Sequence, residues 1–205
     1  MARYTGSAFG RISQKLGDVV GSSWKGIPYI RTRVVPNNPN TVPQQEQRLL
    51  FAVIVLYARQ ILSSVIQVLF DPFARGQSGY NAFCKLNLDS MASDVDFPNL
   101  KISQGSLEGA AISTAVYAAG DVTVTWSPIT SSNGLPGDLV VLVVLDVVNR
   151  VAFVSIGSST RAAAAELVTV GTGRAAANLK AYLGFYRLIN GVVTLVSSTG
   201  YLQVA

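Results

Sequence analysis

The 205-residue sequence contains no histidine and a single cysteine, and both shortages exclude kinds of site. Without histidine there is no Ser-His-Asp triad and no histidine-ligated metal centre. The single cysteine, Cys84, can form no disulfide within the chain and cannot build a thiolate zinc site. We expect Cys84 to be a small buried hydrophobic residue.

Charge is also scarce. Charged residues make up 13% of the chain, against about 25% in an ordinary globular protein, whereas 49% of the residues are hydrophobic. Such a chain has too few charges to be disordered, and fewer than a soluble monomer normally carries on its surface. The simplest cover for this surface is a second copy of the chain.

The positive charge is concentrated near the N-terminus. Residues 1–48 hold seven basic and two acidic residues, and so account for the whole net charge of +5. Such a segment can bind nucleic acid, an anionic surface or an acidic patch on a neighbouring subunit. The first ten residues contain no apolar run typical of a signal peptide. The compartment therefore stays open, with a virion or an extracellular filament favoured.

The composition divides the chain into three segments and predicts an α+β protein. Residues 1–40 form a basic, Gly- and Ser-rich extended arm. Residues 41–97 form a helical hairpin that serves for assembly. Residues 98–205 form a β-sandwich of the immunoglobulin or fibronectin type.

The helical segment is unusually apolar. One unbroken helix is predicted from about residue 44 to residue 70, because this stretch contains neither Gly nor Pro and precedes Asp71-Pro72. Residues 49–56 are apolar on every side of that helix, which predicts burial all round, against neighbouring subunits. A shorter helix is predicted over residues 78–91.

The same segment is long enough to cross a membrane. Residues 49–70 match the length of a membrane span. Arg59 lies in the middle of this stretch, where a charge is costly in a bilayer. We therefore do not expect a membrane as a partner.

The third segment consists of short β-forming runs separated by turn signals about every ten residues. Asn190-Gly191 is the strongest of the hairpin dipeptides. Residues 122–126 alternate in polarity, which predicts one solvated face, whereas residues 139–145 are wholly apolar, which predicts cover on both faces. The predicted strands are 100–102, 112–117, 121–126, 138–147, 150–156, 165–170, 179–188, 192–196 and 201–204.

The sequence contains no catalytic motif. It lacks the phosphate-binding loop G-x-x-x-x-G-K-[ST], the dinucleotide fingerprint G-x-G-x-x-G and the nucleophile elbow G-x-S-x-G. Asp94 and Asp96 form the closest pair of carboxylates, but they lie in a link between segments, where a solvated loop is the simpler interpretation. We therefore predict no enzymatic activity, no cofactor and no metal.

The arm contains candidate binding residues. Two extended stretches, 18–23 and 27–35, flank a predicted turn at Trp24-Lys25-Gly26. Arg31 and Arg33 are two residues apart, so they share one face of a strand. Cations mixed with aromatic residues are typical of single-strand nucleic-acid grooves, and pairing with carboxylates of adjacent subunits is the alternative. The candidates for nucleic-acid binding are Arg11, Lys15, Lys25, Arg31 and Arg33.

Several motifs point to a family. Residues 17–26 read G-D-V-V-G-S-S-W-K-G, and residues 38–48 read N-P-N-T-V-P-Q-Q-E-Q-R ahead of the apolar helix. With residues 79–88 and 102–107, they resemble a family of uncharacterised proteins common in Bacteroidota and their phages. The resemblance covers nearly the whole chain. It implies a non-enzymatic phage or surface structural protein with the same three-part plan.

Our leading hypothesis is a self-assembling structural subunit of a filament or virion, whose main partner is another copy of itself. In this hypothesis the arm and the apolar helix contact neighbouring subunits and the sandwich faces outward. One alternative is a nucleic-acid-binding virion protein, and other virion proteins are further candidate partners. Another is a surface-displayed sandwich that binds a ligand through Tyr117, Trp126 or Tyr201. The residues expected at subunit contacts are Trp24, Lys25, Tyr29, Arg31, Arg33, Leu50, Phe51, Ile54, Val55, Tyr57 and Ile61.

Overall fold

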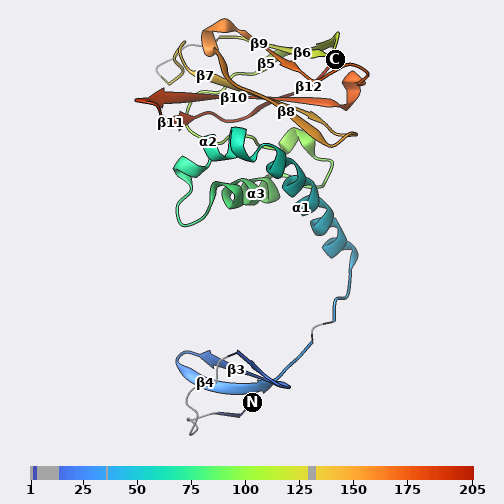
Figure 1. Cartoon of the computed structure of the whole chain (residues 1–205), viewed down its shortest axis with the longest axis vertical. Helices are drawn as coiled ribbons and strands as arrows, with labels where there is room; N and C mark the ends of the chain where they lie inside the picture. The colour runs from blue at the N-terminus through green and yellow to red at the C-terminus, as the bar shows by residue number, and fades with distance from the viewer. Residues whose placement is uncertain (1, 4–13, 36, 129–132) are drawn as a thin grey trace. The chain divides into compact units, whose positions relative to one another are not determined.

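The chain folds into two compact units, Met1–Thr41 and Val42–Ala205, in a computed structural model (Figure 1). The smaller unit is a β-sheet. The larger one contains the helices and the two C-terminal sheets, so the predicted helical and β segments share one folding unit and the protein is of the α+β class. The structure describes residues 2–3, 14–35, 37–128 and 133–205.

The N-terminal unit is a four-stranded antiparallel sheet in the order β1-β4-β3-β2. The predicted turn is confirmed: Lys25 and Gly26 have φ of 49° and 79°, as a tight two-residue hairpin requires. The segment differs from the expected extended arm, because its strands pair with one another. The strands are β1 (Ala2–Arg3), β2 (Gln14–Leu16), β3 (Val19–Trp24) and β4 (Ile27–Thr32).

The helical region of the larger unit contains the two predicted helices, α1 (Val42–Gln60) and α3 (Gly79–Ser90). The prediction of one unbroken first helix is wrong. At Ile61 the backbone leaves the α-helical form (φ −97°, ψ 11°) and continues as the π-helix η1 (Leu62–Ile66). The N–H of Ile66 donates to the carbonyl of Ile61 (3.1 Å), which widens this turn, and the chain bends by 74°.

Short turns connect this bend to α3. The hydroxyl of Ser78 caps α3 by accepting a hydrogen bond from the N–H of Asn81 (3.3 Å), and Cys84 is buried, as predicted. In the described part of the chain, no single helix is long and apolar enough to cross a membrane. Helix α1 and its bent continuation meet that criterion only together, by length and composition. The connecting turns are α2 (Gln67–Leu69) and η2 (Asp71–Phe73).

Two antiparallel sheets complete the larger unit. One has the order β11-β10-β7-β8, with β12 also paired to β10, and the other has the order β5-β6-β9. Asn190 and Gly191 have φ of 53° and 77°, which confirms the predicted hairpin. The strands are β5 (Ile112–Ala118), β6 (Asp121–Trp126), β7 (Leu139–Asp146), β8 (Val151–Thr160), β9 (Ala165–Thr169), β10 (Leu179–Ile189), β11 (Val192–Val196) and β12 (Gly200–Gln203).

One predicted strand, over residues 100–102, is wrong. The short turn η3 (Phe97–Asn99) precedes it, and the side chain of Asn87 binds the backbone of Lys101 in place of a neighbouring strand. The amide of Asn87 donates to the Lys101 carbonyl (3.0 Å) and accepts from the Lys101 N–H (2.7 Å). This stretch is a loop, but its apolar side chains Leu100 and Ile102 are buried in the core shared by the helices and β7, which explains why it resembles a strand in sequence.

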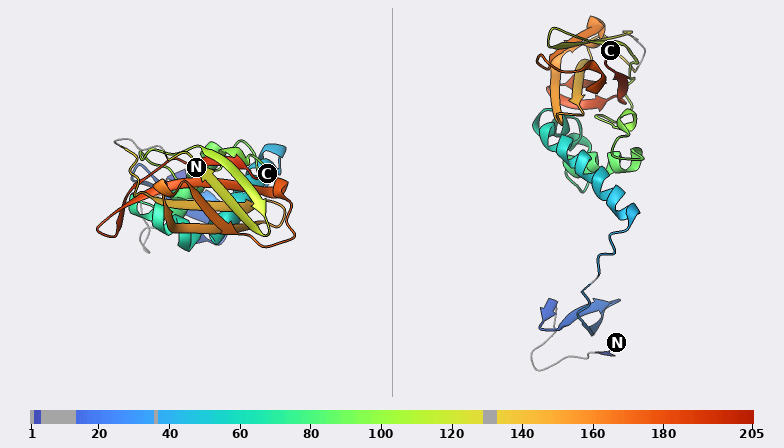
Figure 2. Two further views of the ribbon diagram at one scale, coloured as in Figure 1. Left: turned by 90° about the horizontal axis from the view of Figure 1, so that it is seen from above. Right: turned by 90° about the vertical axis from the view of Figure 1, so that its right-hand side faces the viewer.

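The five-stranded sheet is covered on both faces. Val141 and Val143 of β7 belong to the core shared with the helices, whereas their neighbours Val140, Leu142 and Val144 belong to the core shared with the three-stranded sheet. Figure 1 shows the helices on one side of this sheet and β5, β6 and β9 on the other, and the side view in Figure 2 shows the same layers. The prediction that residues 139–145 are covered on both faces is confirmed.

The three-stranded sheet has one buried and one solvated face, as the alternation over residues 122–126 predicts. Val122, Val124 and Trp126 are buried, whereas Thr123 between them is exposed. Trp126 packs edge-on against Phe185 of the facing sheet, with 5.9 Å between ring centroids. The buried face of the three-stranded sheet therefore forms one wall of the core that lies between the two sheets.

Two adjacent leucines of α1 test the burial of this helix. Leu50 is 2% exposed and Leu49 is 56% exposed. We predict that Leu50→Ala lowers the free energy of unfolding by about 2–5 kcal/mol, because it leaves a cavity. Leu49→Ala is the matched control and lowers it by about 1 kcal/mol or less. Urea unfolding at low protein concentration measures both changes, and equal losses would contradict the assignment.

Candidate functional site

The N-terminal sheet presents cations on one face. Val20 pairs directly with Lys15 on one neighbouring strand and with Arg31 on the other. Residues opposite each other in an antiparallel sheet point to the same side, so Lys15 and Arg31 share a face across three strands. Arg33 continues the alternation of β4, and all three cations are exposed.

Two aromatic residues lie on the same face. Trp24 pairs with Ile27, which alternates with Tyr29 and Arg31 along β4. Trp24 is 65% exposed, Tyr29 is half-buried, and the ammonium of Lys25 lies 4.9 Å from the Trp24 ring. The fold therefore brings together Lys15, Lys25, Arg31 and Arg33, which were predicted to bind nucleic acid, whereas Arg11 lies outside the described residues. We call this surface the basic–aromatic face, made of Lys15, Trp24, Lys25, Tyr29, Arg31 and Arg33.

The opposite side of the same sheet carries four apolar side chains beside the polar Ser23 and Thr32. Leu16 pairs with Val19 on this side, and Pro28 and Ile30 of β4 continue it. Leu16 remains 60% exposed, because no second layer from the described residues of the N-terminal unit covers it. We call this surface the apolar face, made of Leu16, Val19, Pro28 and Ile30.

The expected contact residues of α1 and of the bend that follows it fall into two groups. Phe51 is exposed and Val55 is half-buried, so both remain accessible to a second copy. The other four are already buried in the chain's own core, so their burial needs no neighbouring subunit. These are Leu50, Ile54, Tyr57 and Ile61.

An apolar groove of about 330 Å³ runs beside α1. Leu49 on the helix and Val95 on the loop before η3 form exposed parts of its rim, and Tyr57 packs edge-on against Phe97 in its wall. We call it the α1 groove. It is lined by Leu49, Ala52, Val53, Leu56, Tyr57, Asp94, Val95, Phe97, Val147 and Arg150.

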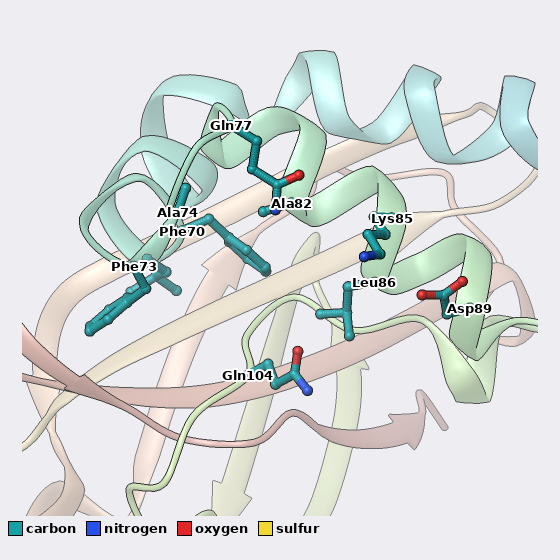
Figure 3. A pocket seen from close by; sticks show the side chains of 10 residues that line it. Phe70, Phe73, Ala74, Gln77, Ala82, Lys85, Leu86, Asp89 and Gln104 are labelled. Atoms are coloured by element: carbon teal, nitrogen blue, oxygen red, sulfur yellow. The ribbon is translucent and has the colours of Figure 1, made fainter. Parts of the chain in front are cut away.

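A second pocket, of about 360 Å³, lies between α3 and the turns after α1 (Figure 3). Phe70 and Leu86 give it apolar walls, and Lys85 and Asp89 extend from successive turns of α3. No ion pair joins Lys85 to Asp89 or to another described residue. Lys85 is the one amine and Asp89 the one carboxylate among its lining side chains.

The three aromatic residues of the ligand-binding alternative make contacts within the fold. The indole Nε1 of the buried Trp126 donates to the carbonyl of Arg161 (3.0 Å). The hydroxyl of Tyr117 donates to the carbonyl of Gly171 (2.9 Å). Tyr201 packs against Tyr182, with ring centroids 5.4 Å apart. These contacts use the polar atoms of Trp126 and Tyr117 within the fold.

The buried charges of the larger unit form structural ion pairs. Asp138 accepts hydrogen bonds from Arg187 (2.6 Å) and Arg161 (3.3 Å), and the guanidinium of Arg161 lies 4.0 Å from the Phe185 ring centre. Asp146 pairs with Arg174. Each carboxylate is fully engaged by arginine and backbone donors, so neither is free to act as a base.

The described residues offer no metal site, because no group of three or more Cys, Asp or Glu side chains could hold an ion. The closest carboxylates in sequence belong to a loop. Asp96 accepts hydrogen bonds from the N–H of Ala92 (2.8 Å) and from Asn99 (3.0 Å), and these bonds hold the pKa of its carboxyl below the ordinary value. Asp96 therefore shapes a turn.

The comparison with known families gives one match, over residues 11–200. The chain belongs to the family of unknown function DUF6266. The expectation of an uncharacterised family is confirmed, and the link to Bacteroidota and phages stays a prediction. No curated protein and no solved structure matches this DUF6266 member. Its surfaces are therefore interpreted from their own geometry.

The Asp146 ion pair makes stability depend on pH. Burial alone would raise the pKa of this carboxyl, but hydrogen bonds from Asn149 and the charge of Arg174 hold it below the ordinary value. A lowered pKa means that the carboxylate stabilises the fold at neutral pH. This contribution is lost as the pH falls from the unfolded-state pKa, about 3.9, through the folded-state value.

We predict that Asp146→Asn lowers the free energy of unfolding by about 3 kcal/mol at neutral pH. The difference from wild type shrinks as the solution is acidified. Urea unfolding across this pH range measures both effects. Asp89→Asn, at an exposed site without an ion pair, is the control and changes little. A difference that is independent of pH would contradict the charge-based explanation.

Proposed function

We propose that the chain is a self-assembling structural subunit of a filament or virion. The observation that carries this proposal is the apolar face of the N-terminal sheet, where Leu16 is 60% exposed and the other three residues are half-buried among the described residues. A sheet needs a hydrophobic partner layer for stability. The low charge of the chain, 13%, is consistent with a surface that other copies cover.

In this proposal, the apolar face of one copy lies on the α1 groove of the next copy. Both surfaces are apolar, and Leu16 and Leu49 are exposed on them. Electrostatics favours this arrangement over pairing between two N-terminal sheets. Residues 1–41 hold six basic residues and one acidic residue, whereas residues 42–205 hold ten of each. Two N-terminal units therefore repel each other, but neither repels the neutral larger unit.

The linker between the two units limits how far the N-terminal sheet can reach from its own larger unit. Residues 33–41 connect β4 to α1, and nine residues span at most about 30 Å when extended. The contact joins different surfaces of two copies, so it is head-to-tail. Such a contact repeats into an open polymer unless its rotation closes a ring.

We also infer a fibronectin-type sandwich in the larger unit. The first, second and fifth strands after the helices pair in one sheet, and the third, fourth, sixth, seventh and eighth lie in the other. An immunoglobulin constant domain keeps the fourth strand beside the fifth. Here β8 instead pairs with β7, the third strand, which supports the fibronectin alternative. The helices then occupy the outer face of the second sheet.

Point variants on the two surfaces test the assembly. We predict that Leu16→Gln or Leu49→Gln raises the concentration needed for assembly by about 10–100-fold, because each removes one buried leucine from the contact. Light scattering and negative-stain microscopy measure this concentration. Leu167→Gln is the matched control, since Leu167 is an exposed leucine on β9. A wild-type chain that stays monomeric at high concentration would contradict the proposal.

A further inference from the structure

We propose that the basic–aromatic face of the N-terminal sheet binds single-stranded nucleic acid. This inference goes beyond assembly, because it concerns the side of the sheet opposite the apolar face. The whole net charge of +5 belongs to residues 1–41. Asp18 is the single acidic residue among them, so the field of this unit attracts anions.

The cations are placed to contact a polyanion. Lys15 and Arg31 lie on either side of Val20 across the sheet, which separates them by about 10 Å. Arg31 and Arg33 are two residues apart, or about 7 Å along the strand. None of these three side chains forms an ion pair or hydrogen bond with another described residue. Their charges are therefore available to successive phosphates of an extended strand.

The aromatic residues on this face identify the class of polyanion. Trp24 is largely exposed beside Lys25, and Tyr29 precedes Arg31 in the alternation of β4. A single strand offers both phosphates and free base faces, and stacking of a base on an aromatic ring contributes about 1–3 kcal/mol. In a duplex the bases stack on one another and are not available to Trp24. The alternation of rings and cations therefore favours a single strand over a duplex.

Tryptophan fluorescence of the full chain tests this binding. Trp126 is 3% exposed, so quenching by an oligothymidylate reports on Trp24, the other of the two tryptophans. We expect quenching that weakens steeply with salt. Arg31→Gln with Arg33→Gln removes two phosphate contacts. This double variant reduces the salt slope of log K by about 1.4 and weakens binding at least tenfold at low salt.

Two control variants show whether a loss of binding is specific to the basic–aromatic face. Arg75→Gln with Lys85→Gln removes the same charge from exposed sites of the larger unit and is expected to bind like wild type. Leu16→Gln, on the apolar face, is expected to weaken assembly and keep the quenching. Assembly that fails while binding persists therefore separates the two proposals.

Several results would overturn the inference. These are the absence of salt-sensitive quenching, unchanged binding by the double arginine variant, and equal binding of a duplex of the same length. Binding to phosphatidylserine vesicles without binding to the oligothymidylate would assign the face to a membrane surface instead. Loss of assembly in the double arginine variant, without any nucleic-acid binding, would assign it to subunit contacts.

Discussion

The structure depends on one requirement, that the five-stranded sheet be covered on both faces. Strand β7 is buried along nearly its whole length, so neither of its faces can meet water. The three-stranded sheet covers one face and the helices cover the other. The helices are therefore part of the same core as the strands. This explains why α1 buries Leu50 and Ile54 without help from another subunit.

The N-terminal sheet does not meet the same requirement. No layer formed by the described residues of this unit covers its apolar face, and its other face carries cations and aromatic rings. In our two proposals, the two faces bind two different partners. An apolar surface on another copy suits the first face, and an anionic polymer with flat bases suits the second. Assembly and nucleic-acid binding are compatible in this account, because they use opposite sides of one sheet.

Local signals predicted much of the fold. The turns at Lys25-Gly26 and Asn190-Gly191 were predictable, because residue type directly limits positive φ. The break at Ile61 was not predictable, because neither Gly nor Pro marks it in the sequence. The basic–aromatic face was partly predictable from the spacing of Arg31 and Arg33. The α1 groove was not predictable, since Val95 and Val147, which both line it, come from loops far apart in the sequence.

The central claim is that a second copy covers the apolar face and the α1 groove. Hydrogen–deuterium exchange, compared below and above the concentration at which the full chain assembles, tests it most directly. The account predicts slower exchange on assembly in peptides from β2 to β4 and from the first half of α1. Unchanged exchange in both regions, with protection confined to the three-stranded sheet, would contradict it.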